Sequence, residues 1–235
     1  MFHVFTPFRN AWVKQIKQHN IIIAPHPQDV LEQYQPIAAQ RFTFDTNKTC
    51  SAKWPLVSDI KKQVISDFLT NKHASYKQER DFPALKGTSG LSPYFAIGAL
   101  SCKALANTVL QAHPFILDNP KADIFCWLNE LAWRDFYKHL LFTYPDLIKG
   151  ITFSQKYSAL NWPNNTHYFT AWCEGKTGYP LVDAAMRQLR QTGWMHNRLR
   201  MVVASFLTKH LLVDWRLGEQ FFMQHLIDGD FSANN

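Results

Sequence analysis

Cysteine is scarce in this sequence, and long apolar runs are missing. The 235 residues include only four cysteines, at positions 50, 102, 126 and 173, and no two of them form a C-x-x-C pair. This spacing argues against a disulfide framework and against a zinc knuckle. No apolar run is long enough to cross a membrane, and Arg9 and Lys14 stand where a signal peptide needs an apolar core. We therefore expect a cytoplasmic chain with no membrane partner.

Acidic residues are also few. The chain has 18 of them against 25 lysines and arginines, which gives a formal net charge of +7. Such an excess favours polyanionic partners, but an ordinary soluble basic protein shows it too, so charge alone leaves nucleic acid open. The 46% of hydrophobic residues are enough for a substantial core, which argues against disorder.

Strand-like alternation is nearly absent, whereas helical spacing of apolar residues is common, so the predicted fold class is all-α. The predicted helices cover residues 1–20, a stretch from residue 58 onward, 92–110, 123–143, a stretch opened by Pro180, 195–212 and 216–226. Residues 21–55 carry scattered prolines and predict an irregular segment that wraps over the core. We therefore divide the chain into residues 1–57, a helix with a wrapping segment, and residues 58–235, a helical domain.

Familiar catalytic signatures are missing as well. Gly175-Lys176-Thr177 is not a P-loop, because Thr170 stands where the motif needs a glycine. Asp228 and Asp230 flank a glycine without a histidine partner of metal-ligand spacing, so we predict no metal site. No serine lies in a nucleophile-elbow sequence.

Three segments concentrate polar chemistry. The small-residue loop 87–93 leads into a helix, so it predicts either a phosphate site or ordinary helix capping. On the helix 123–143, one face carries Glu130, Trp133, Arg134, Tyr137 and Lys138. That face is either a solvated salt-bridging surface or a cleft wall where an aromatic ring stacks on a base and cations hold phosphates.

The third segment is 194–200. Arg198 and Arg200 point in different directions on a helix, so one could pair with a buried carboxylate while the other reaches outward. Asp228 and Asp230 are the carboxylates available downstream.

Together these segments resemble the flavin-binding helical domain of the DNA photolyase and cryptochrome family. The matching stretches come in family order, and they are 88–93, 127–137, 175–180 with 183–187, 193–201 and 228–235. The resemblance implies a U-shaped FAD in the middle of the helical domain, beneath a basic surface into which a pyrimidine dimer is flipped.

The resemblance also assigns cofactor-binding residues. These are Tyr76, Thr88, Ser89, Gly90, Leu91, Ser92, Trp127, Arg134, Asn197, Arg200, Asp228, Gly229, Asp230 and Asn234. The loop 88–92 would cradle the pyrophosphate. Asp228 and Asp230 would face the flavin and its ribityl chain, with Arg200 as the ion-pair partner of Asp228. Asn234 would lie beside flavin N5.

DNA-binding and catalytic residues follow in the same way. The resemblance implies DNA contacts by Arg80, Glu130, Trp133, Tyr137, Asn197 and Arg198. Among the catalytic residues Glu130 would hydrogen-bond the dimer, Trp133 would stack on it, and Asn234 would tune the flavin. Trp162 and Trp215 would pass electrons to the excited flavin.

The implied activity is light-dependent repair of pyrimidine dimers by electron transfer from excited reduced FAD. Asn197 and Met201 stand where photolyases of (6-4) photoproducts carry histidines, which favours cyclobutane dimers as the lesion. A blue-light signalling protein on the same fold and a flavin-free DNA-binding remnant are the alternatives. We expect a monomer that binds damaged DNA.

The sequence also departs from the family pattern. We expect these residues to lack the family's N-terminal α/β domain, and an antenna pigment such as a folate or a deazaflavin would belong mainly to that domain. The chain stops at Asn235, where family members continue with a Gly-Gly-Trp-x-Trp stretch. We therefore expect a catalytic domain that is incomplete at its C-terminus.

Overall fold

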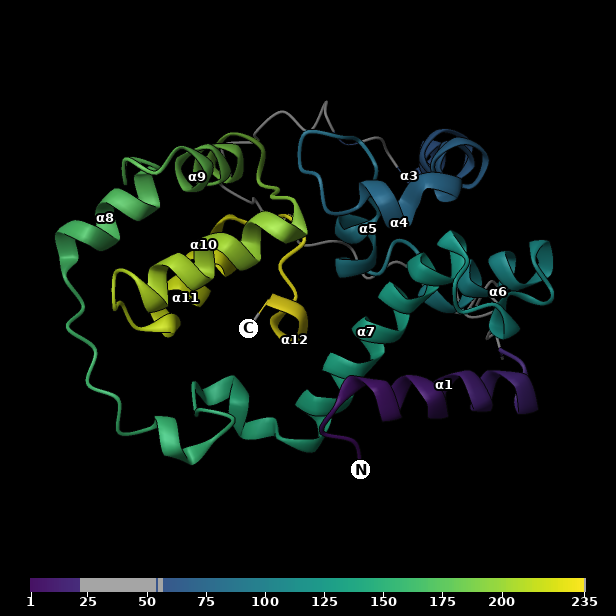
Figure 1. The fold of residues 1–235 in the computed structure, drawn as a ribbon, viewed down its shortest axis with the longest axis horizontal. Coiled ribbons are helices and arrows are strands. Elements are labelled where there is room, and N and C mark those ends of the chain that lie inside the picture. The colour runs from purple at the N-terminus through teal and green to yellow at the C-terminus, as the bar shows by residue number, and fades with distance from the viewer. Residues whose placement is uncertain (22–53, 55–56, 235) are drawn as a thin grey trace, which may run out of the picture.

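The computed structural model describes residues 1–21, 54 and 57–234, and this part of the chain contains helices and no strand. The all-α prediction is therefore confirmed (Figure 1). The longer helices are α1 (Phe5–His19), α6 (Cys102–Ala112), α7 (Asp123–Thr143), α8 (Thr166–Glu174), α9 (Pro180–Thr192), α10 (Asn197–Lys209) and α11 (Trp215–His225). The shorter α-helices are α3 (Val57–Ile60), α4 (Tyr76–Glu79), α5 (Ser92–Ala96) and α12 (Phe231–Asn234). The wrapping segment predicted for residues 21–55 lies outside the described residues, apart from Ile21 and Trp54.

Several predicted boundaries agree with the structure. Helix α7 covers the predicted residues 123–143, and α9 begins at Pro180, whose fixed backbone angle suits a first helical position. Helices α10 and α11 begin and end within a few residues of their predicted limits. The stretch from residue 58 continues α3 with π-helical turns at Lys61–Ile65 and Phe68–Lys72.

The single helix predicted for residues 92–110 was wrong. The structure splits it into α5 and α6, because Gly98 adopts a positive φ of 73° and Ser101 starts a new helix. The Ser101 hydroxyl accepts a hydrogen bond from the Ala104 amide at 3.2 Å, which is the usual role of an N-cap serine. The sequence prediction also missed α8, although Asn165 caps its start and Gly175 follows its end in the left-handed region.

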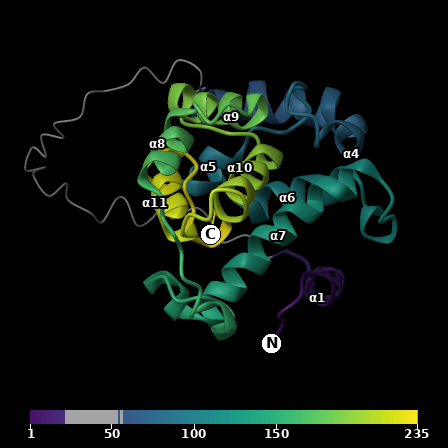
Figure 2. The ribbon, with the colours of Figure 1, turned by 60° about the vertical axis from the view of Figure 1, so that its left-hand side comes forward.

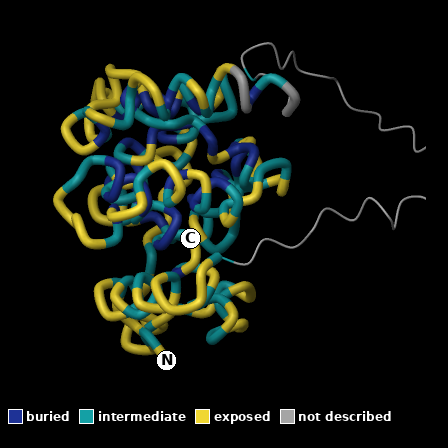
Figure 3. Tube along the Cα trace, turned by 90° about the vertical axis from the view of Figure 1, so that its right-hand side faces the viewer, coloured by how far each residue is buried: buried dark blue, intermediate teal, exposed yellow. Residues whose placement is uncertain are grey.

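The buried side chains form two hydrophobic clusters. The first gathers residues from the α3 stretch, α4, α5, α6 and the first half of α7, and the second gathers residues from α8, α9, α10 and α11. Figure 2 shows the second group together on one side, with α7 extending away from it. The buried segments lie inside these groups, whereas the region near the N-terminus is mostly half-buried or exposed (Figure 3).

Helix α1 packs along α7 and has no fully buried residue. Its contact is aromatic: the ring of Phe5 stacks on Trp133 with a centroid distance of 3.5 Å, and Phe8 lies 5.4 Å from Phe136. Trp12 donates its indole hydrogen bond to Asp135 at 2.9 Å. Among the described residues, no helix is both long and apolar enough to cross a membrane.

Candidate functional site

A buried ion pair joins α10 to the end of the chain. Arg200 donates to both carboxylate oxygens of Asp228 at 2.9 and 2.7 Å, and Asp228 is only 4% exposed. The same guanidinium donates to the Met195 carbonyl at 2.9 Å and to the Asn234 side-chain oxygen at 2.9 Å. The predicted pairing of Arg200 with Asp228 is therefore present, and it fixes the loop that leads into α12.

A second ion pair joins α7 to the residue that precedes α12. Arg134 pairs with Asp230 and also donates to the Phe95 carbonyl at 3.2 Å, which adds the end of α5 to the same cluster. Ser232 donates its amide and its hydroxyl to Asp230 at 3.0 and 2.5 Å. Although burial opposes ionisation, the hydrogen bonds from Ser232 and Arg134 hold the pKa of Asp230 below its usual range. Asp230 is therefore a carboxylate at neutral pH.

Helices α7, α10 and α12 thus bring Arg134, Arg200, Asp228, Asp230 and Asn234 together. The Asn234 amide donates to the backbone carbonyls of Asp230 at 3.2 Å and Asp228 at 3.4 Å, so protein groups already engage it. Asn197 is exposed at the first position of α10, the helix that also carries Arg200.

Residues 88–91 of the loop precede α5, and Ser92 is the first residue of that helix. Gly90 has a φ of +65°, and a Cβ built on it would meet nothing within 4 Å, so open space adjoins the loop. Among the described residues, no hydrogen bond uses the side chains of Thr88 or Ser89, while the Ser92 hydroxyl accepts from the Trp194 indole at 3.4 Å. Leu91 is buried in the first hydrophobic cluster. The loop therefore offers free hydroxyl groups beside open space.

Two further predicted cofactor residues lie in the core. Trp127 is 2% exposed and Tyr76 is 6% exposed, and the ring of Phe68 contacts both. Burial raises the pKa of Tyr76.

The predicted DNA contacts Arg80 and Glu130 pair with each other. Arg80 also donates to the Cys126 sulfur at 3.4 Å and lies 5.6 Å from the ring centre of Tyr76. Burial raises the pKa of Glu130, and the charge of Arg80 opposes that rise. Glu130 and Arg80 therefore form one unit that joins α7 to the end of α4.

Trp133 contacts several aromatic rings. Phe5 stacks on it with an angle of 7° between the ring planes, and Tyr137 lies 5.6 Å away at 24°. The indole stays half-buried rather than covered on all sides. A base that stacks here would share the ring with Phe5.

Arg198 points away from Arg200, as predicted, and reaches a residue that the sequence reasoning missed. Its guanidinium donates to Asp81 at 2.5 Å, and both side chains are about half-exposed. Beneath them His196 is 3% exposed and accepts the Arg198 amide hydrogen bond through Nδ1 at 3.1 Å. The only sequence signal for Asp81 is its position beside Arg80.

An apolar cavity of about 580 Å³ lies between the end of α7, the segment 147–162, the start of α11 and the start of α12. Trp162 and Trp215 both line it, together with Tyr137 and Phe231. The two predicted electron-relay tryptophans thus share one cavity wall, next to the cluster that α12 completes.

The Gly175-Lys176-Thr177 segment has a structural role that agrees with the rejection of a P-loop. The buried carboxylate of Asp183 accepts hydrogen bonds from the amides of Thr177 and Gly178 at 2.7 and 3.0 Å and from the Thr177 hydroxyl at 2.6 Å. These donors are therefore unavailable to a phosphate. Among the described residues, no group of three His, Cys, Asp or Glu side chains could hold a metal ion.

Comparison with known proteins gives consistent matches. Residues 127–235 match the family model described as the FAD binding domain of DNA photolyase. The chain is 44% identical over 237 residues to a deoxyribodipyrimidine photo-lyase of Salmonella typhimurium, covering all of this chain and 50% of that protein. It is also similar to a class III photolyase structure from Agrobacterium tumefaciens, with a TM-score of 0.74, 34% identity and coverage of 99% of this chain and 49% of that one. A Synechocystis cryptochrome structure matches with a TM-score of 0.71 and 27% identity, over 98% of this chain and 49% of that one.

These matches place residues 127–235 in the family of the FAD-binding domain of DNA photolyase, and they show that the chain has the helical fold of photolyase and cryptochrome structures. Within this family, the curated relative described above is a deoxyribodipyrimidine photo-lyase. The chain spans about half the length of the curated relatives that it matches.

Proposed function

We propose that this chain is the flavin- and DNA-binding part of a deoxyribodipyrimidine photo-lyase that repairs cyclobutane pyrimidine dimers in light. The observation that carries the proposal is the convergence of Arg134, Arg200, Asp228, Asp230 and Asn234 where α7, α10 and α12 meet. The sequence similarity to deoxyribodipyrimidine photo-lyases supports it.

The residues present fit FAD. The free hydroxyls of Thr88 and Ser89 lie beside open space at Gly90, which suits a pyrophosphate. Asp228, Asp230 and Asn234 are hydrogen-bonded within the protein, and they would face a ribityl chain and a flavin ring with the carboxylate and amide lone pairs that remain. When bound, reduced FAD would supply the light-excited electron donor, and the protein residues would position it and tune its surroundings.

On the DNA side, Arg80 and Arg198 would hold phosphates, Trp133 and Tyr137 would stack on the flipped lesion, and Asn197 would contact it. Trp162 and Trp215 would line the route by which electrons reach the flavin. Glu130 would hold the dimer by a hydrogen bond. Because Asn197 and Met201 stand in place of histidines, we favour the cyclobutane dimer over the (6-4) photoproduct. A monomer in the cytoplasm and the division of the chain at residues 57 and 58 are parts of the same proposal.

The direct test of the cofactor is the absorbance spectrum of the purified chain after incubation with FAD and gel filtration. Visible flavin absorbance that co-elutes with the protein is the expected result. A colourless protein would favour the flavin-free DNA-binding alternative.

The activity itself is tested with a dimer-containing oligonucleotide under blue light. Light-dependent loss of the dimer by the flavin-loaded chain, or by a longer form of the protein that contains it, supports repair. Flavin binding without repair in the longer form would favour the signalling alternative, which the similarity to a cryptochrome structure supports.

Glu130 gives a residue-level prediction for the same assay. We expect Glu130→Ala to lower the repair yield while binding to dimer-containing DNA is largely kept. Because Glu130 pairs with Arg80 in the structure, Glu130→Gln is the sharper variant: it keeps a hydrogen-bonding side chain of the same size and removes the charge. Equal losses of binding and of repair in both variants would argue against the role of Glu130 in repair.

A further inference from the structure

Asp81 lies between the two arginines that the proposed function places on DNA. One of its carboxylate oxygens is 2.5 Å from Nη2 of Arg198 and 3.7 Å from Nε of Arg80. Arg80 is the neighbour of Asp81 in the chain, whereas Arg198 lies 117 positions after Asp81. A single acidic side chain therefore faces both guanidiniums.

The ion pair is exposed enough for DNA to compete with it. The side chains of Arg198 and Asp81 are 42% and 50% exposed, and pairs at such positions contribute little net stability because water and salt screen them. The hydrogen bond from Arg198 holds the pKa of Asp81 below its usual range, so the carboxylate stays charged at neutral pH.

A buried histidine caps the helix start that carries Arg198. His196 is buried and its Nδ1 caps the start of α10 by accepting the Arg198 amide. Its ring proton must then lie on Nε2, which has no hydrogen-bond partner of good geometry and faces the Arg80 backbone carbonyl. His196 therefore fixes the start of α10 through its cap, next to the end of α4.

Charge at this surface is locally balanced although the chain is basic overall. Arg80 is paired with Glu130, and Arg198 is paired with Asp81, whereas the chain as a whole carries a net charge of +7. A DNA phosphate that binds Arg198 must therefore displace Asp81 or accept a carboxylate beside it.

We propose that Asp81 is an intramolecular counter-ion that competes with DNA phosphate for Arg198 and so lowers sequence-independent DNA affinity. This rests on the proposed DNA-binding function. Asp81 does not touch the lesion in this proposal, and it acts through Arg198.

The test compares Asp81→Asn with the original chain in binding to an undamaged duplex and a dimer-containing duplex across a salt series. We expect affinity for both duplexes to rise about two- to fivefold, the range set by an exposed ion pair. The plot of log affinity against log salt should become steeper by about one, as for one additional phosphate neutralised.

Asp146→Asn is the matched control, because it also removes one negative charge from an exposed ion pair. Its partner is Lys149, at 2.8 Å, outside the proposed DNA surface. If Asp146→Asn raises affinity as much as Asp81→Asn does, general charge explains the gain and the proposal is overturned. Unchanged or weaker binding by Asp81→Asn overturns it as well.

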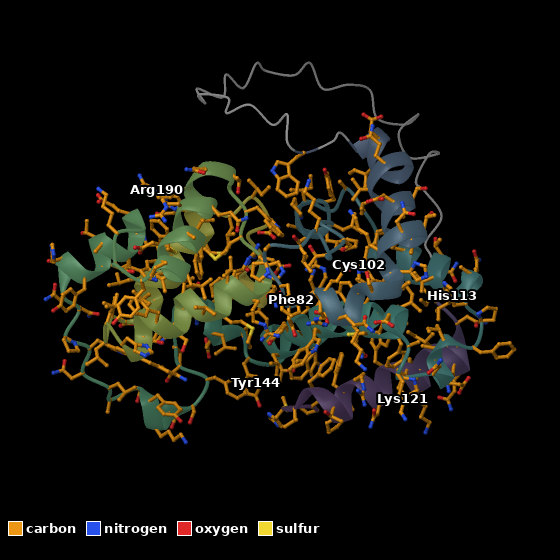
Figure 4. All side chains as sticks on the ribbon, turned by 45° about the horizontal axis from the view of Figure 1, so that its top comes forward. Phe82, Cys102, His113, Lys121, Tyr144 and Arg190 are labelled. Atoms are coloured by element: carbon orange, nitrogen blue, oxygen red, sulfur yellow. The ribbon has the colours of Figure 1, made fainter. Side chains whose placement is uncertain are left out.

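A second measurement needs no DNA. Phenylglyoxal modification, mapped by mass spectrometry, should label Arg198 faster in Asp81→Asn, with Arg190 as an internal reference. Arg190 is exposed on α9 and its side chain points outward (Figure 4).

If the original chain does not bind DNA, the DNA part of the proposed function fails and this proposal falls with it. If it binds DNA while Arg198 labelling and the salt slope stay unchanged, only the role of Asp81 fails.

Discussion

His196 illustrates how one buried side chain organises the edge of this site. It caps α10, and it faces the Arg80 carbonyl on a different segment. The sequence pattern indicated Arg198 and Arg200, both in the first turn of α10, but assigned nothing to His196, because a histidine at a helix start gives no distinctive pattern. Its role depends on a neighbour that is distant in sequence.

Stability should depend on pH through His196. Burial and the charges of Arg198 and Arg200 lower its pKa, although Asp81 opposes this. The folded pKa thus lies below the unfolded value of about 6.5, so neutral His196 contributes stability above that pH and the contribution is lost as pH falls below it. Between about pH 7.5 and pH 5.5, the free energy of urea unfolding should fall less in His196→Asn than in the original chain, because asparagine caps helices without titrating. Parallel losses in both proteins would contradict this role.

At the scale of elements, the helix ends are where local sequence and packing interact. The proline at the start of α9 and the apolar spacing of α7 act locally, so their positions were predicted correctly. The break between α5 and α6 was missed, because Leu100 and Ala104 continue a helical apolar spacing across it. Gly98 and Ser101 end one helix and start the next, and the stripe of apolar residues hides that signal.

The junction between α8 and α9 gives a prediction about glycine. Gly175 has a φ of +65°, and an added Cβ would lie 2.8 Å from the Asp183 carbonyl oxygen. Gly178 also has a positive φ, of +85°, but an added Cβ there meets nothing within 4 Å. We expect Gly178→Ala to cost about 1 kcal/mol from backbone strain alone and Gly175→Ala to cost a further 1–3 kcal/mol or so from the steric clash.

Denaturant unfolding of the two glycine variants measures this difference. Both should stay folded by circular dichroism at low temperature, so that the free energies can be compared. Equal destabilisation would mean that the backbone relaxes away from Asp183 and that the contact does not define the junction.

At the scale of the whole molecule, charged pairs connect the two hydrophobic clusters. Arg134 on α7 pairs with Asp230, and Arg200 on α10 pairs with Asp228, so both clusters are linked to the same short segment at the end of the described chain. The proposed cofactor site therefore depends on the packing of elements that are distant in sequence.

Removing one partner of the buried pair should destabilise the fold strongly. Arg200→Met leaves Asp228 charged in a position where its side chain is 1% exposed, which costs about 3–5 kcal/mol. Adding Asp228→Asn should recover part of that loss, since the unpaired charge is gone. Denaturant unfolding of both single variants and the double variant measures the coupling. A double variant as unstable as the sum of the single variants would show that the pair does not act as a unit.

The sequence by itself determined the helical class, the positions of α7 and α9, and the ordered segments that mark the family, because helix spacing, caps and motifs are local properties of the chain. It also predicted that Arg198 and Arg200 diverge and that Arg200 meets Asp228, since helix geometry and the family pattern together give that pairing. Only the tertiary structure decided that Arg80 pairs with Glu130, that Asp81 holds Arg198, and that Phe5 stacks on Trp133. These contacts join segments far apart in the chain, and their partners are selected by packing rather than by local periodicity.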